Sequence, residues 1–88
     1  MGLVAILGAT GAIGGTIASR LVAGGTSVLL IGRDCDKLAA VSQELSQPVF
    51  CWGSMDSQSL VDGLSEAAER HGGISGVVNC IGSLLLKP

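Results

Sequence analysis

A glycine-rich segment directly after the first apolar run constrains this chain most. Leu3–Leu7 is a continuous apolar run rich in strand-forming residues, and it stops at Gly8. Residues 8–14 then read Gly-Ala-Thr-Gly-Ala-Ile-Gly. Apolar residues next recur every four positions, at Ile13, Ile17 and Leu21. This change of period predicts a buried strand, a tight turn and a helix, in that order.

Each glycine of the turn, which has the spacing G-x-x-G-x-x-G, has an expected role in binding a dinucleotide. Gly8 turns the chain sharply off the strand, Gly11 lets a pyrophosphate approach the backbone, and Gly14 lets the helix lie close to the sheet. The helix N-terminus offers unpaired N–H groups and the positive end of its dipole to the phosphates. A tight turn without a ligand is the alternative. We expect the cofactor to contact Gly8, Thr10, Gly11, Ala12, Ile13 and Gly14.

The rest of the chain alternates strand and helix signals in the same way. Three further strands are predicted, at Ser27–Ile31, Val49–Trp52 and Gly76–Cys80. Asp34 and Asp56 are placed to cap the two helices between them. Their expected inward residues are Leu38, Val41 and Leu45 in the first helix, and Leu60, Leu64 and Ala67 or Ala68 in the second. The glycines after His71 end the last helix.

This alternation with short links predicts one α/β domain over residues 1–88. The sheet should be parallel, in strand order 3-2-1-4, with three right-handed crossover helices. The first two helices cover one face and the third lies alone on the other. We expect an incomplete doubly wound domain in which the fourth strand is an exposed edge beside open apolar surface. The leucines at 84–86 fit a segment that packs against further structure.

The residues after the second predicted strand indicate which dinucleotide is bound. An NAD site places Asp or Glu at this strand end to hold the ribose 2′-hydroxyl. Here Gly32 is followed by Arg33, which can bind a 2′-phosphate through its fork of N–H donors. The sequence therefore favours NADP over NAD. Asp34 is interpreted as the helix cap, although it could instead hold a ribose hydroxyl, and Arg33 could be a solvated loop residue.

Composition excludes several classes of function. The net charge is −2 and the five basic residues are scattered, so nucleic-acid binding is not expected. No apolar run approaches the ~20 residues of a membrane span, and a cytoplasmic protein is expected. The three cysteines, Cys35, Cys51 and Cys80, form no Cys-x-x-Cys pair, and the sequence contains a single histidine as a further potential metal ligand. We expect no metal site and three reduced cysteines.

Three segments together resemble the short-chain dehydrogenase/reductase family. They are residues 7–14, residues 30–34 with Lys37-Leu38, and residues 76–82 (Gly-Val-Val-Asn-Cys-Ile-Gly). The resemblance covers the N-terminal, cofactor-binding part of a Rossmann-like domain. It implies that Asn79 steadies the central strands and that the backbone of Asn79, Cys80 and Gly82 lies along the cofactor ribose. Gly53 stands where the family often has an adenine-binding Asp, so the Ser54 backbone or the Trp52 ring could border the adenine instead. The alternative for Trp52 is a residue that packs in the core or at the edge of the sheet.

The resemblance also implies an oxidoreductase that interconverts carbonyl and hydroxyl groups by hydride transfer. The family's catalytic groups are a Ser and a Tyr-x-x-x-Lys pair, and this sequence contains no tyrosine. We assign no catalytic residue, and His71 is expected to be exposed. The small-molecule carbonyl or alcohol substrate, and any homo-oligomer contacts, would then involve segments outside these 88 residues. A non-catalytic NAD(P)-binding sensor module and an inactive truncated product remain alternatives.

Overall fold

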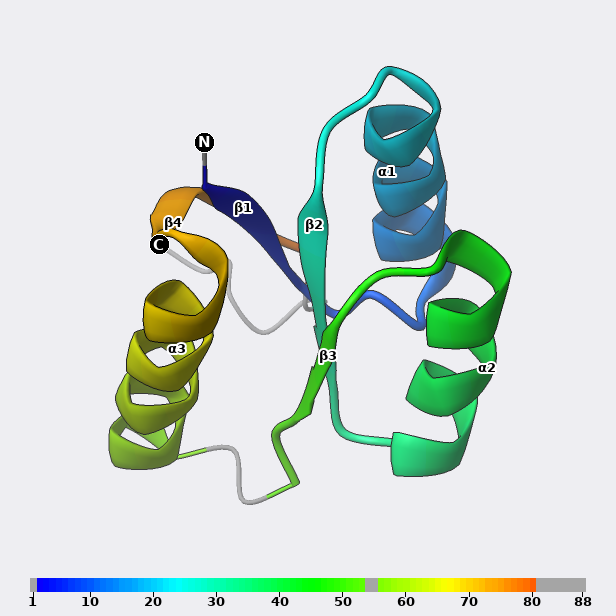
Figure 1. Ribbon diagram of the computed structural model, residues 1–88. Helices are drawn as coiled ribbons and strands as arrows, with labels where there is room; N and C mark the ends of the chain where they lie inside the picture. Colours follow the sequence, from blue (N-terminus) through cyan, green and yellow to red (C-terminus); the bar gives the residue numbers. More distant parts are fainter. Residues whose placement is uncertain (1, 54–55, 81–88) are drawn as a thin grey trace, which may run out of the picture.

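The computed structural model describes residues 2–53 and 56–80. Strands and helices alternate along this part of the chain (Figure 1). They are β1 (Leu3–Leu7), α1 (Ala12–Ala23), β2 (Val28–Gly32), α2 (Cys35–Leu45), β3 (Val49–Cys51), α3 (Ser57–His71) and β4 (Ile74–Asn79). The strands form one parallel sheet in the order β3-β2-β1-β4. The predicted α/β class and strand order are confirmed, with strand ends displaced by one or two residues.

The strand register brings the carboxyl ends of all four strands to one edge of the sheet. Leu7, which ends β1, lies opposite Ile31 of β2 on one side and Asn79 of β4 on the other. Gly32 of β2 lies opposite Cys51 of β3. The links that follow these strands therefore start next to one another, although they are far apart in the sequence.

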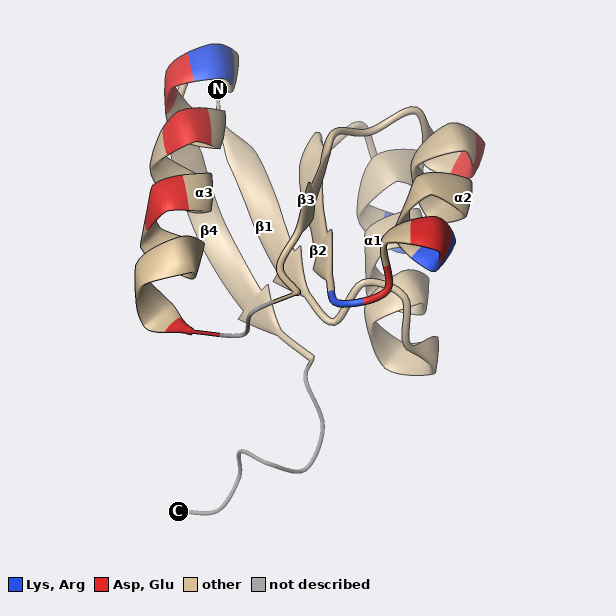
Figure 2. Ribbon diagram, turned by 90° about the horizontal axis from the view of Figure 1, so that it is seen from below, with Lys and Arg blue, Asp and Glu red and all other residues tan. Residues whose placement is uncertain are grey.

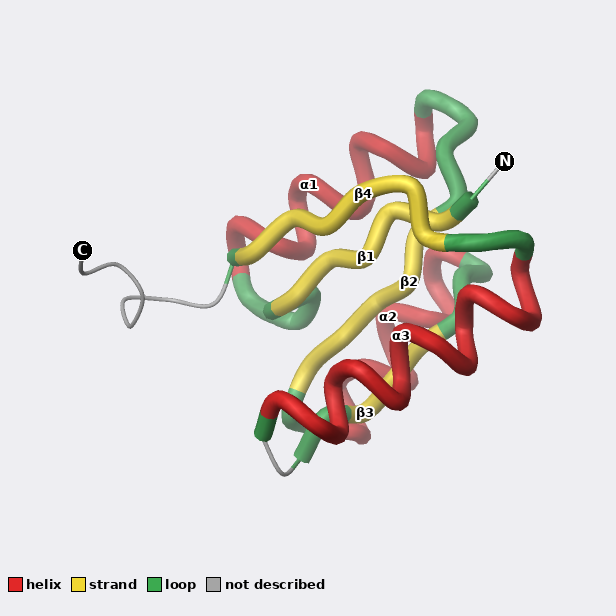
Figure 3. The backbone as a smooth tube through the Cα atoms, turned by 90° about the vertical axis from the view of Figure 1, so that its left-hand side faces the viewer, coloured by secondary structure: helices red, strands yellow, loops and turns green. Residues whose placement is uncertain are grey.

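The helices cover the sheet unevenly, with α1 and α2 on one face and α3 alone on the other (Figure 3). Alternate residues of β1 and β2 point to these two faces. The α3 side holds Leu3, Ala5, Leu7, Leu29 and Ile31, and the side of α1 and α2 holds Ile6, Val28 and Leu30. Both central strands are buried on two faces, which explains why their sequences are continuous apolar runs rather than alternating ones.

The predicted helix ends are confirmed by their capping contacts. The carboxylate of Asp34 accepts hydrogen bonds from the backbone N–H groups of Asp36 and Lys37, both at 3.1 Å. Asp56 accepts one from the N–H of Ser59 at 3.1 Å. At the other end of α3, Gly72 has a φ of 87°, the left-handed conformation that commonly stops a helix.

The expected inward stripe of α1 is wrong at its first member. Ile13 has 70% of its surface exposed, whereas Gly14 and Ala18 are buried. Successive helical residues are turned by about 100°, so the face that includes Gly14 turns Ile13 outward. The two later members, Ile17 and Leu21, do pack against the core on that side.

The expectation of three reduced cysteines is also wrong. Cys35 and Cys51 form a disulfide with their Cα atoms 5.4 Å apart, and Cys80 is free. The pair is separated by 16 residues, and the parallel pairing of β2 with β3 brings its two members together. Spacing along the sequence does not reveal this contact, because it depends on the register of two strands.

Strand β4 is an edge of the sheet within the described residues. It pairs with β1 alone, and Val77 on its α3-side face is 55% exposed. Val77 is thus an exposed apolar residue on this strand, whereas the leucines at 84–86 lie outside the described residues. No helix in the described part of the chain is long and apolar enough to cross a membrane.

Candidate dinucleotide site

The turn after β1 is fixed by backbone hydrogen bonds to the neighbouring strand. The N–H groups of Gly8 and Ala9 both donate to the carbonyl oxygen of Ile31, at 2.9 and 3.0 Å. Gly8 has a φ of 83°, a backbone conformation that residues with a side chain rarely adopt. Its carbonyl oxygen accepts a hydrogen bond from the N–H of Gly11 at 3.0 Å. The turn is thus a closed, preorganised unit at the carboxyl edge of the sheet.

The N-terminus of α1 is built differently from those of the other two helices. Its N-cap is Gly11, no side chain caps it, and its first turn contains no acidic residue. The first intrahelical bond described runs from the N–H of Gly15 to the carbonyl of Gly11, at 2.8 Å. The N–H groups of Ala12, Ile13 and Gly14 come before that bond and face the helix end. Such a terminus favours an anionic ligand.

The glycines at positions 11 and 14 differ in what a side chain would meet. A Cβ on Gly14 would lie 2.9 Å from the carbonyl carbon of Gly8 and 3.2 Å from the Cα of Ala9, so helix and turn are in direct backbone contact. A Cβ on Gly11 would meet one atom, the oxygen of Gly8 at 3.5 Å, and Gly11 is exposed. The backbone at Gly11 is therefore open to a ligand, and this cradle fits a pyrophosphate.

The end of β2 places a cation beside this turn. Arg33 is exposed and lies two residues after Ile31, whose carbonyl holds the turn. Gly32 is buried, and a Cβ there would lie 3.5 Å from the Cγ2 of Thr10. The Asp34 carboxylate caps α2, which confirms the cap interpretation. The ribose-hydroxyl alternative for Asp34 is not tested by this contact.

The end of β4 flanks the turn on the opposite side. Asn79 is paired with Leu7, and the N–H of Cys80 donates to the Leu7 carbonyl at 2.9 Å. The strand order reverses at β1, which is followed by α1 on one face of the sheet while α3 leads into β4 on the other. Ligands of open α/β sheets bind at the carboxyl ends of the strands at such a point. The predicted residues Gly82 and Ser54 lie outside the described residues.

Trp52 serves the core at this edge. It is buried at 8% exposure, packs with the α3-side cluster, and donates its indole N–H to the Asp56 carbonyl at 2.9 Å. This confirms its interpretation as a packing residue. The Trp52 ring is held between β3 and α3 rather than lying open at the edge.

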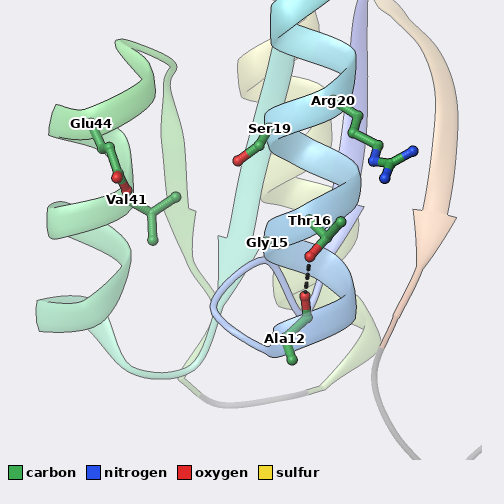
Figure 4. Close-up of a pocket in the computed structure, with 7 residues that line it drawn as sticks. All are labelled: Ala12, Gly15, Thr16, Ser19, Arg20, Val41 and Glu44. Carbon is green, nitrogen blue, oxygen red and sulfur yellow. Dashed lines mark hydrogen bonds between the residues drawn. The ribbon is translucent and has the colours of Figure 1, made fainter.

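A groove lies beside the turn, not in it. It encloses about 450 Å³ between α1 and α2 (Figure 4), and its wall is formed by Ala12, Gly15, Thr16, Ser19, Arg20, Val41 and Glu44. Ser19 points towards α2 and Val41 towards α1, but Arg20 points to the other side of α1 (Figure 4). The Thr16 hydroxyl is engaged with the carbonyl of Ala12 at 2.8 Å. No set of charged groups converges in this groove.

The acidic residues of α3 lie away from the turn, whereas Asp34 and Asp36 lie near it at the start of α2. Figure 2 views the sheet from the side of its carboxyl ends and shows the acidic residues of α3 along its outer surface, away from the start of α1. One of them, Glu66, forms an exposed ion pair with Arg70 at 3.3 Å. No cluster of three or more potential metal ligands occurs within the described residues.

Comparisons with known proteins agree with this geometry. A family model described as short chain dehydrogenase matches residues 2–88. A short-chain type dehydrogenase/reductase from Mycobacterium ulcerans is 29% identical, with a TM-score of 0.84 over 93% of this chain and 33% of its own. A putative short-chain dehydrogenase/reductase from Sinorhizobium meliloti 1021 is 28% identical, with a TM-score of 0.78 over 99% of this chain and 43% of its own.

A third structure, YwfH, an NADPH-dependent reductase involved in bacilysin biosynthesis, shares the fold. It is 20% identical, with a TM-score of 0.82 over 94% of this chain and 38% of its own. The chain thus spans between a third and less than half of the length of these solved structures. No curated protein matches the chain.

Two features of the site differ from what the sequence predicts, namely the outward orientation of Ile13, which is itself an expected cofactor contact, and a disulfide. Ile13 places an exposed apolar side chain on the first turn of α1, beside the uncapped N–H groups. The Cys35–Cys51 disulfide begins two residues after Arg33. The sequence gives one indication that Ile13 is exposed, because this apolar residue lies inside a glycine motif that is expected to bind a ligand. The sequence alone contains nothing that indicates the disulfide.

Proposed function

The chain belongs to the short-chain dehydrogenase family, and we propose that it is the NADP(H)-binding part of an oxidoreductase. Members of this family are oxidoreductases whose N-terminal sheet binds NAD(P). The observation that carries the proposal is the start of α1, which has neither a side-chain cap nor an acidic residue and lies against a backbone-fixed glycine turn. The two other helices within the described residues are each capped by an aspartate.

Specific residues would hold the cofactor. The N–H groups at the start of α1 would bind the pyrophosphate at Gly11, where no side chain blocks its approach. Arg33 would bind the 2′-phosphate, which favours NADP over NAD. Asn79 and Cys80 would border the ribose on the β4 side, and Thr10 lies between the turn and Gly32. Gly82 and Ser54 complete the proposed contacts.

The chemistry that a bound nicotinamide dinucleotide supplies is hydride transfer. We propose a small-molecule carbonyl or alcohol as substrate of the whole protein and the cytoplasm as its location. The proton donor would come from outside these residues, because the sequence has no tyrosine. We therefore assign this chain the binding and orientation of the cofactor, not the chemical step.

Calorimetric titration of the chain with NADPH, NADH and inorganic pyrophosphate tests the proposal. We expect NADPH to bind more tightly than NADH, and pyrophosphate to bind weakly and to compete with both. The matched control is a Gly11→Val variant, in which a branched side chain covers the exposed backbone. If the unaltered, folded chain binds neither dinucleotide, the proposal is wrong; if NADH binds as tightly as NADPH, the NADP preference is wrong.

A further inference from the structure

We propose that Cys35 and Cys51 form a reversible redox modification site that sets how tightly the adjoining Arg33 segment holds the 2′-phosphate of NADPH. The inference rests on the proposed function and adds regulation to that site. It starts from the disulfide, whose Cα–Cα distance of 5.4 Å lies within the range of native disulfides.

The disulfide joins two elements at the carboxyl edge of the sheet. Cys35 is the first residue of α2 and Cys51 the last residue of β3. Gly32 pairs with Cys51 in the sheet, and its carbonyl accepts from the N–H of Trp52 at 2.8 Å. The link between β2 and α2 consists of Arg33 and Asp34 alone. It is thus held at Gly32 by the sheet and at Cys35 by the covalent bond.

The bond is accessible to solutes. Cys35 is exposed and Cys51 half-buried. A small-molecule thiol can therefore reach it, and exchange proceeds by thiolate attack through a mixed disulfide. Overall, two thiol molecules give up two electrons and two protons and become one disulfide, while the Cys35–Cys51 bond breaks into two thiols. A small-molecule disulfide reverses the reaction with the same balance.

Reduction would loosen the link without unfolding α2. The helix keeps the Asp34 cap, the bond from the Leu38 N–H to the Asp34 carbonyl at 2.9 Å, and the buried Leu38 side chain. What it loses is the covalent tether directly after the link. Arg33 then has more conformations to give up when it binds a phosphate, and such ordering opposes binding.

The consequence is specific to one cofactor. NADPH engages Arg33 through its 2′-phosphate, so its affinity should be about three- to tenfold higher in the oxidised protein than in the reduced one. NADH has no 2′-phosphate and binds through the glycine turn, which contains no cysteine. Its affinity should be the same in both forms.

The experiment compares the chain after treatment with oxidised glutathione and after treatment with a thiol reductant. Maleimide is added first to the native and then to the unfolded protein, so that the number of labels counts the free thiols. We expect a label on Cys80 alone in the first sample and on all three cysteines in the second. Calorimetry then gives the affinities for NADPH and NADH in each. The double variant Cys35→Ser, Cys51→Ser should lose the redox response and bind NADPH as the reduced protein does.

Each contrary result has a separate meaning. Three labelled thiols after oxidation, equal NADPH affinities in the two forms, or an equal change for NADPH and NADH would overturn the redox site and leave the proposed function standing. Failure of both dinucleotides to bind either form would overturn the proposed function and this inference together. The comparison of oxidised and reduced wild-type protein holds even if a cysteine variant fails to fold.

Discussion

Gly14 lies so close to Gly8 that a Cβ on Gly14 would fall 2.9 Å from the Gly8 carbonyl carbon. Both contacting groups are backbone, so neither can move aside as a flexible side chain would. The contact joins the first helix to the turn that leaves β1, and it positions the uncapped N–H groups of α1. The same contact turns Ile13 outward.

We therefore expect Gly14→Ala to lower the free energy of unfolding by about 2 kcal/mol, because a methyl group forced into a packed contact displaces backbone. Urea denaturation followed by circular dichroism measures the loss. The matched control is Gly15→Ala, where the nearest atom to a Cβ is the Ala9 oxygen at 3.4 Å. Alanine favours a helix over glycine by about 1 kcal/mol, so this control should be as stable as the parent or more so. Equal stability of the two variants would contradict the argument.

Gly11→Ala separates binding from folding. A Cβ at this position has ordinary contact with the Gly8 oxygen at 3.5 Å, and the φ of −81° suits alanine. We expect a stability loss below about 1 kcal/mol from the poorer N-cap. Pyrophosphate affinity should fall by about tenfold or more, because a methyl group keeps the anion from charge-assisted hydrogen bonds with the N–H groups. Titration with pyrophosphate and NADPH measures this, and unchanged affinity would place the phosphates elsewhere.

Much of the fold was predictable because local signals and tertiary packing agree. The apolar runs of β1 and β2 are continuous because both strands are buried on two faces. Asp34 and Asp56 were identifiable as caps from their place before each helical stripe, and both make the expected bonds. Parallel order followed from strict alternation of strands and helices.

The features that escaped prediction depend on contacts between elements. Ile13 matches the helical period of Ile17, but the backbone contact of Gly14 decides which face of α1 is buried. The bond between Cys35 and Cys51 depends on the register of β2 with β3. Local composition predicts neither the close approach of two backbone segments nor the register of two strands.

The packing of α3 gives a prediction about the sheet's second face. A Cβ on the buried Gly63 would lie 2.7 Å from the Cδ2 of Phe50 and closer still to two other ring atoms. Gly63→Ala should therefore cost about 1–3 kcal/mol in the parent. In a Phe50→Leu background the smaller side chain leaves room, and the same change should cost less or become stabilising through helix propensity. A double-mutant cycle by urea denaturation measures this coupling; additive effects would contradict the ring contact.

Asp34 has a structural role that substitution can separate from any role in binding. Its carboxylate accepts from two backbone N–H groups at the start of α2, so Asp34→Ala should lower the free energy of unfolding by about 1 kcal/mol. Asp34→Asn keeps an acceptor and should retain most of that stability. Thermal denaturation compares the two. If the Asn variant is stable but binds NADH more weakly than the parent, Asp34 also holds a ribose hydroxyl.

Arg33 provides the most direct test of cofactor choice. It follows the strand whose Ile31 carbonyl anchors the glycine turn, and no acidic side chain stands at Gly32 to repel a phosphate. Arg33→Ala should weaken NADPH binding by about 1.5–3 kcal/mol, the value of a hydrogen bond to a charged group, and leave NADH nearly unchanged. Lys37→Ala, which removes another exposed cation from the first turn of α2, is the control and should affect NADPH far less. Calorimetry with both dinucleotides decides the matter, since an equal loss for NADPH and NADH would mean that Arg33 does not contact the 2′-phosphate.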